Sequence, residues 1–150
     1  MNQNEDTEAF LNERREKLGG ELIFRSYATW YGRSDGDERG FGVFMYSDGN
    51  TLVIEDFERT PTLFGIRYSP KRKSEYVKLE IFIPLRAVQR IDTVTRTSAE
   101  SSVRHLRDEG KEASLFARLF RKTVTRMVLD DVSYYIETAD TDKLRKLIGR

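Results

Sequence analysis

Cysteine is missing from this chain of 150 residues, and histidine occurs once, at His105. Without cysteine there is no disulfide framework, thiolate metal site, cysteine nucleophile or thiol redox chemistry. A single histidine does not make a zinc cluster either. The composition therefore predicts a protein without a metal or a cofactor, and it fits a reducing compartment such as the cytoplasm.

Long apolar runs and an excess of one charge are also lacking. No run approaches the ~18 apolar residues of a membrane span, and the polar, acidic start of the chain does not resemble a signal peptide. Lys and Arg number 26 against 25 Asp and Glu, for a net charge of +1. Nucleic-acid-binding proteins usually carry a basic excess on one face, so no nucleic-acid partner is expected. We expect a cytoplasmic protein, with a peripheral position at the inner face of the membrane as the alternative.

Strand-forming residues dominate the stretch from 21 to 97, which is rich in aromatic and β-branched side chains. The tip at 47–50 contains Asp-Gly and Gly-Asn pairs, which supply the positive φ angles of tight turns. Gly40 and Gly42 on either side of Phe41 suggest a bulge or a strong bend. The expected strands are 21–32, 41–46, 51–57, 62–68, 76–83, 88–97, 123–129 and 132–136, with 62–68 and 76–83 forming one hairpin around 69–74.

Helical patterns occur at both ends of the chain and in one insertion. Asp6 and Thr7 are candidate caps of the first helix, and Thr141 is the candidate cap of the last. The expected elements are an N-terminal helix over 6–18, a helical or loop insertion over 98–121 and a closing helix over 142–148. No linker or repeat divides the chain, so we expect a single domain over 1–150 in which 1–19 is an N-terminal helical appendage.

Two passages carry a resemblance to a known family. Residues 81–85, Ile-Phe-Ile-Pro-Leu, are followed by Val88 and Ile91, and the hairpin 127–136 leads into a helix that begins near 142–144. This order resembles the pleckstrin-homology-like domains, including their bacterial and GRAM-type relatives. The resemblance implies a mainly β fold, a bent antiparallel seven-stranded barrel capped by a C-terminal α-helix, here with an extra N-terminal helix. It also implies the binding of proteins or peptides.

The lipid-binding members of that family place a Lys and an Arg-x-Arg around the first hairpin to hold phosphates. In this sequence the corresponding tip carries Asp35, Asp37 and Glu38. These carboxylates would repel an inositol phosphate. We therefore expect the fold of the family without its phosphoinositide recognition.

Residues 32–36 match G-x-S-x-G, the turn that carries the nucleophile in α/β-hydrolases. That chemistry requires a strand-to-helix turn around Ser34, whereas a polar turn and another strand follow here. His105 would have to be the base and Asp56 the third member of the triad. The context of the motif predicts a hairpin turn, and we expect no catalytic residues and no enzyme activity.

A second partial motif match is to the PilZ domains, which bind a cyclic dinucleotide through R-x-x-x-R followed by D-x-S-x-x-G. Arg86 and Arg90 have the first spacing, and Asp131 and Ser133 begin the second, but Ile136 stands in place of the glycine. The gap between the two motifs is also too long. A degenerate nucleotide-binding barrel of this type stays an alternative.

A basic, apolar segment is the leading candidate for partner binding. Four large apolar residues fall at helical spacing over 115–120, and cationic residues stand within and after them. The predicted partner-binding residues are Leu115, Phe116, Arg118, Leu119, Phe120, Arg121 and Lys122. The function expected is a non-enzymatic binding module for another protein. An anionic membrane surface is the alternative partner, for this segment or for the basic hairpin tip Lys71, Arg72 and Lys73.

Overall fold

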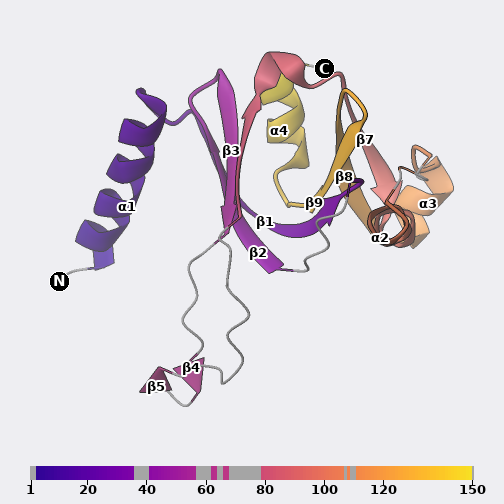
Figure 1. Ribbon diagram of the computed structural model, residues 1–150, viewed down its shortest axis with the longest axis horizontal. Coiled ribbons are helices and arrows are strands. Elements are labelled where there is room, and N and C mark those ends of the chain that lie inside the picture. Colours follow the sequence, from indigo (N-terminus) through magenta and orange to yellow (C-terminus); the bar gives the residue numbers. More distant parts are fainter. Residues whose placement is uncertain are drawn as a thin grey trace.

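A computed structural model describes residues 3–35, 41–56, 62–63, 66–67, 79–106, 108 and 111–149, without the side chains of 3, 41, 62–63 and 66–67. Seven of its strands form one antiparallel sheet in the order β6-β3-β2-β1-β9-β8-β7, which confirms the mainly β prediction (Figure 1). The strands are β1 Phe24–Arg33, β2 Phe41–Ser47, β3 Thr51–Asp56, β6 Glu80–Pro84, β7 Arg90–Thr95, β8 Thr123–Leu129 and β9 Val132–Glu137. Among the described residues β6 and β7 are the two edges and do not pair with each other, so the sheet is open.

The two tight hairpins lie where the turn residues place them. Between β2 and β3, Gly49 has a φ of 97°, and the Asp48 carboxylate accepts hydrogen bonds from the backbone N–H groups of Asn50 and Thr51. Between β8 and β9, Asp130 takes a φ of 49°. Local turn chemistry is sufficient to set both connections.

The predicted hairpin of 62–68 with 76–83 is wrong. β4 (Thr62–Leu63) pairs with β5 (Ile66–Arg67) in a separate two-stranded sheet, and β6 pairs with β3. The pairing of β6 with β3 sets Ile54 opposite Ile81 and Leu52 opposite Ile83. These side chains belong to or pack on the main core, so apolar burial decides the pairing. The turn expected at 69–74 lies outside the described residues.

A register irregularity of the sheet lies in β1. A bulge or bend was predicted at Gly40 and Gly42, of which Gly40 lies outside the described residues. Gly42 pairs regularly with Thr29, whereas the register of β1 against β9 shifts between Trp30 and Gly32. Gly32 has a φ of 136°, a conformation that side chains rarely allow. Such a bulge bends a strand and increases its twist, so β1 can pair with β2 along its first part and with β9 along its last.

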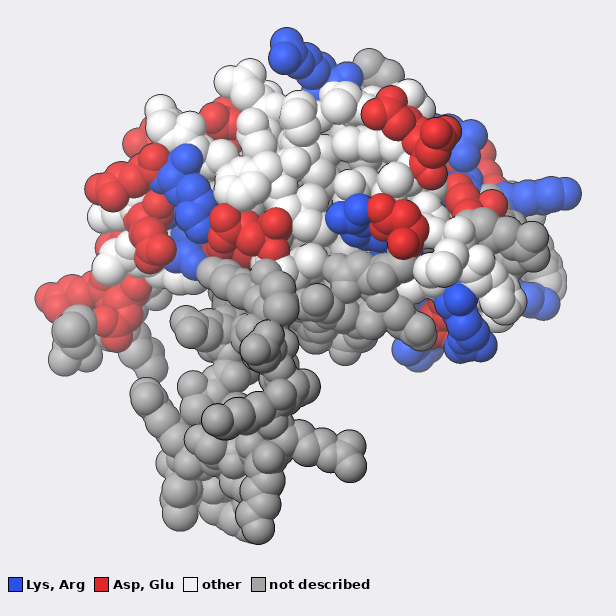
Figure 2. All heavy atoms as spheres, in the orientation of Figure 1, with Lys and Arg blue, Asp and Glu red and all other residues white. Residues whose placement is uncertain are grey.

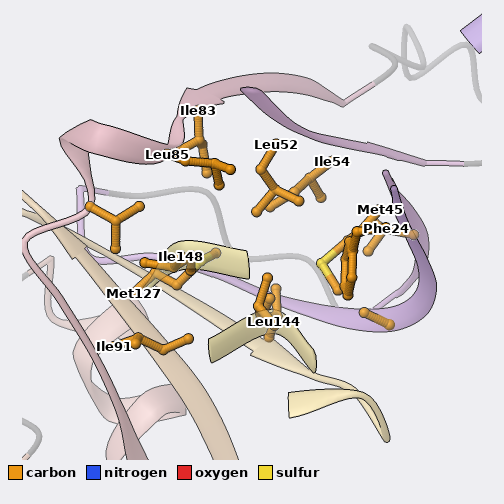
Figure 3. Packing of buried hydrophobic residues seen from close by; sticks show 14 of the residues in the cluster. Phe24, Met45, Leu52, Ile54, Ile83, Leu85, Ile91, Met127, Leu144 and Ile148 are labelled. Atoms are coloured by element: carbon orange, nitrogen blue, oxygen red, sulfur yellow. The ribbon is translucent and has the colours of Figure 1, made fainter. Parts of the chain in front are cut away.

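Helix α4 (Thr141–Ile148) fills the concave side of the bent sheet, as Figure 1 shows. Its Leu144 and Ile148 point into the same core cluster as Leu52 of β3 and Met127 of β8 (Figure 3). The short helix η1 (Leu85–Ala87) joins the two edge strands and adds Leu85 to this core. The predicted closing helix is confirmed, and Gly149 ends it with a φ of 77°. Asp140 and not Thr141 is the N-cap residue.

Helix α1 (Gln3–Leu18) begins before Asp6, so the predicted caps Asp6 and Thr7 lie inside it. It packs on the outer face of the sheet, where Leu11 lies in a cluster with Phe44, Tyr46 and Val53. The Arg14 guanidinium donates to the buried Glu55 carboxylate at 2.7 Å. The segment predicted as an appendage is therefore held to the sheet by an apolar cluster and an ion pair.

The predicted insertion over 98–121 contains two helices, α2 (Arg96–Arg104) and α3 (Leu115–Phe120). The strand β7 stops at Thr95 rather than continuing to 97, because the Thr95 hydroxyl accepts from the Ser98 N–H and caps α2. Ala99 and Val103 of α2 pack on Val94 and Val124 on the outer face of the sheet.

Candidate docking surface

Four large apolar side chains project from α3. Leu115, Phe116, Leu119 and Phe120 are 74%, 65%, 70% and 71% exposed. Their spacing sets them on one face of the helix, while Ala117 on the other face is buried against the body of the protein. The rings of Phe116 and Phe120 lie 4.8 Å apart. An apolar patch of this kind on a surface typically marks an interaction site, and we call these four residues the α3 surface.

Positive charge surrounds the α3 surface. Arg118 pairs with Glu112 at 2.9 Å, while Arg121 and Lys122 are exposed directly after the helix. Residues 96–122 contain seven Lys or Arg and four Asp or Glu, a net charge of +3 in a chain whose total is +1. Figure 2 shows Lys and Arg side chains projecting at the side where Figure 1 places α2 and α3. The residues predicted for partner binding thus lie together on one exposed element.

Both ends of the segment that carries α3 are attached to the edge of the sheet. The Ala113 N–H donates to the Thr93 carbonyl at 2.6 Å, just before α3. After it, the Lys122 carbonyl accepts from the Arg96 N–H at 2.9 Å. The Ser114 hydroxyl accepts from the Ala117 N–H and caps the helix. These contacts hold α3 in place although little of it is buried.

A single carboxylate attaches the connection between α2 and α3 to the outer face of the sheet. Asp108 accepts from the Tyr135 hydroxyl at 2.8 Å, from the Ser133 hydroxyl at 2.7 Å and from Arg126 Nη1 at 3.1 Å. Hydrogen bonds to an ionised group are stronger than those between neutral groups. The Asp108 side chain therefore fixes this connection, and with it the position from which α3 starts.

Arg126 is the centre of that attachment. Its guanidinium is buried and forms a bidentate pair with Asp92. Nε donates to one carboxylate oxygen at 2.7 Å and Nη2 donates to the other at 2.6 Å. Burial alone would lower the pKa of Arg126, but the bonds and charges of Asp92 and Asp108 outweigh it and raise this pKa. Burial also raises the pKa of Tyr135 to about 12, with Asp108 adding to the effect.

The sequence reasoning missed Asp92, Asp108, Arg126 and Tyr135 as a group. Asp92 pairs with Arg126 and Arg126 with Tyr135 across β7, β8 and β9, so the three side chains form one row on the outer face. A charged residue at the centre of each of two expected strands was the available clue. Only the strand register brings those positions together.

The structure gives the hydrolase-like residues other roles. Ser34 is buried; its N–H donates to the Ser133 carbonyl at 2.9 Å and its hydroxyl accepts from the Ser133 N–H at 2.8 Å. Asp56 accepts from the Leu79 N–H at the end of β3, and His105 is exposed after α2, with Nδ1 3.3 Å from the Ser101 hydroxyl. These two contacts of Ser34 join the ends of β1 and β9.

Arg86, Arg90 and Ser133 of the PilZ-like motif fall on three elements, η1, β7 and β9. Arg86 is exposed in η1, Arg90 pairs with Asp92 at 3.2 Å, and the Ser133 hydroxyl is engaged by Asp108. The basic hairpin tip Lys71, Arg72 and Lys73 lies outside the described residues, and so do the acidic Asp37 and Glu38.

A polar hollow of about 460 Å³ lies beside α3, between β8 and α4. Half of its lining residues are threonines, with Arg118 and Arg145 as its cations and Glu137 and Asp142 as its anions. Because the two signs balance, this hollow shows no preference for a charged ligand. It is a weaker candidate than the α3 surface.

Within the described ranges, no three His, Asp or Glu side chains are grouped so as to hold a metal ion. None of the helices in the same part of the chain combines the length and apolar character of a membrane span. Comparisons of the chain with protein-family models, with curated proteins and with solved structures find no significant match.

Proposed function

We propose that this protein is a non-enzymatic interaction module of the pleckstrin-homology-like kind, which docks onto another protein or onto a membrane surface through the α3 surface. The observation that carries the proposal is the exposure of all four large apolar side chains of α3 on an element that is attached at both ends. Apolar side chains that stay in water contribute none of the free energy that their burial would add to folding. A docking role gives that surface a use.

The kinship with the pleckstrin-homology-like domains is part of the proposal. Seven antiparallel strands, a bend in the first of them and a C-terminal helix in the concavity support it. We take the bent, open sheet as the counterpart of that family's barrel, and α4 as the counterpart of its capping helix. The roles of Ser34 in strand contacts support the non-enzymatic part.

Two partner classes follow from different observations. The family resemblance favours a protein or peptide. The cationic residues next to the apolar side chains favour an anionic membrane surface instead. Either partner would cover the α3 surface.

The absence of cysteine allows a test that does not depend on the class of partner. Leu119→Cys introduces one thiol on the α3 surface, and Ile23→Cys introduces one at a position of nearly equal exposure, 66% against 70%. The rate of maleimide labelling is compared between purified protein and intact cells of the native host, using a membrane-permeant reagent. We expect the thiol at 119 to label several-fold more slowly in cells and the thiol at 23 to label at similar relative rates. Equal slowing at both positions, or none at 119, contradicts docking through α3.

A further inference from the structure

We infer that the surface on which α3 docks is an anionic membrane, with the four apolar side chains entering the lipid interface and the neighbouring cations facing the headgroups. This inference rests on the proposed docking function. It names the partner of the α3 surface, which the proposed function leaves between a protein and a membrane.

The shape of the α3 surface favours lipid over a protein partner. Each of the four side chains is at least 65% exposed, so they project outward instead of lining a groove. Protein partners are usually anchored by side chains that enter well-packed pockets. A lipid interface needs no matching pocket, because acyl chains and headgroups rearrange around a projecting side chain. An interfacial helix lies in the plane of the membrane and buries its apolar face to a depth of ~5–10 Å, which outward-projecting Leu and Phe side chains allow.

The charges around α3 are arranged as an interfacial helix requires. Arg118 lies between the two apolar pairs, and the exposed Arg121 and Lys122 follow Phe120 directly. The cations therefore stand at the border of the apolar face, where headgroup phosphates would meet them. Each Lys or Arg near an anionic membrane surface adds to the electrostatic attraction. The net charge of +3 over 96–122 disfavours a second copy of the chain as the partner, since two such segments would repel each other.

The attachment of α3 to the sheet makes its exposure a stable feature. The backbone bonds at Ala113 and Lys122 and the carboxylate of Asp108 hold the flanking residues to the body of the protein. The apolar side chains are thus presented outward before any partner is met. Docking does not require the entropic cost of ordering a free segment.

Co-sedimentation with lipid vesicles tests the inference on the full chain. One set of vesicles contains phosphatidylcholine alone, and the other contains equal amounts of phosphatidylcholine and phosphatidylserine. We expect the protein to pellet with the second set and not with the first. Raising the ionic strength from about 0.01 M to about 0.15 M, which shortens the Debye length from about 30 Å to about 8 Å, should weaken binding markedly.

Matched variants distinguish vesicle binding through the α3 surface from nonspecific adsorption of the protein to vesicles. Phe116→Ser with Phe120→Ser should lower vesicle binding about tenfold or more, given the contribution of each buried aromatic ring. Ile23→Ser with Tyr27→Ser removes two side chains that are 66% and 70% exposed elsewhere, and should leave binding unchanged. Arg121→Glu with Lys122→Glu should abolish the preference for phosphatidylserine, whereas Lys143→Glu with Lys146→Glu on α4 should not. Far-ultraviolet circular dichroism confirms that each variant is folded.

Insertion has its own spectroscopic readout. Phe116→Trp introduces an exposed indole, while the native Trp30 is completely buried and gives a constant background. Binding to phosphatidylserine vesicles should shift the emission of the new indole to the blue and allow quenching by brominated acyl chains. Adsorption by charge alone would leave its emission unchanged and would overturn the insertion of α3.

The two proposals fail in different ways. No pelleting of wild type with phosphatidylserine vesicles at low salt, or an equal loss in the Ile23 and Tyr27 control, overturns the membrane inference. If the thiol at position 119 is nevertheless protected in cells, the docking function stands and the partner is a protein. If the thiol is not protected, the proposed function itself falls.

Discussion

Tyr46 and Tyr135 are both completely buried, and they differ in what their hydroxyl groups contact. The Tyr135 hydroxyl donates to Asp108 at 2.8 Å. The Tyr46 hydroxyl has no hydrogen-bond partner within the described residues. Burial, with the charge of Glu55 adding to it, raises the pKa of Tyr46 to about 12. One tyrosine therefore supports a hydrogen-bond network, and the other contributes mainly by packing beneath α1.

Tyr46→Phe should leave the free energy of unfolding unchanged, or raise it slightly, at neutral pH, because it removes an unsatisfied buried hydroxyl. In wild type, the unfolded chain loses the tyrosine proton near 10.0 and the folded chain only near 12. The neutral form is thus favoured by folding, so this stabilisation is complete below pH 10 and is lost as the pH rises from 10 to 12. Urea titrations of the variant over this range should show a smaller alkaline loss than wild type.

Tyr135→Phe is the control for that experiment. It removes a donor to Asp108 and should lower the free energy of unfolding by about 1–2 kcal/mol at neutral pH. If Tyr46→Phe costs as much as Tyr135→Phe at neutral pH, the Tyr46 hydroxyl has a hydrogen-bond partner and our account of it is wrong.

At the scale of elements, the segment from α2 to α3 combines a firm attachment with an exposed end. α2 packs on the sheet through Val103 and its neighbours, and Ala113 is bonded to the edge strand. Between them, Asp108 is the described side chain that reaches the buried Arg126. The order of the segment that leads into α3 should therefore depend in part on this carboxylate.

Asp108→Ala should increase backbone hydrogen exchange over 111–120 while leaving exchange in β1, β2 and β3 as it is. The substitution removes the acceptor of Ser133, Tyr135 and Arg126, but Arg126 keeps its bonds to the buried Asp92. Hydrogen exchange measured by mass spectrometry resolves these segments. Asp142→Ala, an exposed carboxylate at the start of α4, is the matched control. Uniformly faster exchange throughout the Asp108 variant would show that this residue supports the whole fold.

At the scale of the molecule, α4 stabilises the concave side of an open sheet. Leu144 is completely buried and touches the core built by strands from both halves of the sheet (Figure 3). β6 and β7 do not pair among the described residues, so η1 and α4 link the two edges of the sheet through apolar contacts in place of backbone hydrogen bonds. The fold should accordingly lose stability as a unit when α4 is weakened.

Leu144→Ala should lower the free energy of unfolding by about 2–5 kcal/mol through a single cooperative transition. Leu119→Ala is the same chemical change at an exposed position and should alter stability by less than about 0.5 kcal/mol. Chemical denaturation followed by circular dichroism and by Trp30 fluorescence checks both. A transition in which α4 melts before the sheet, seen as a difference between the two probes, would contradict this role of α4.

The sequence by itself determined the features that depend on neighbouring residues. The turns at 47–50 and at Asp130, the hairpin of β8 with β9 and the closing helix follow from local conformational preferences. The clustering of apolar and cationic residues over 115–122 is also a local pattern, and it located the candidate surface. That pattern did not show whether the apolar face of the helix is buried or exposed. Apolar residues have the same spacing in a helix that packs on a core and in a helix that presents its apolar face to a partner.

Only the tertiary structure decided the features that depend on distant residues. Pairing of β6 with β3, the bulge at Gly32 and the row of Asp92, Arg126 and Tyr135 all join positions far apart in the chain. Each depends on burial and strand register, which are set by the competition of all the strands for one core. The exposure of the α3 side chains is likewise a tertiary result, since they lie outside the core that Leu144 and Ile148 of α4 share with the strands.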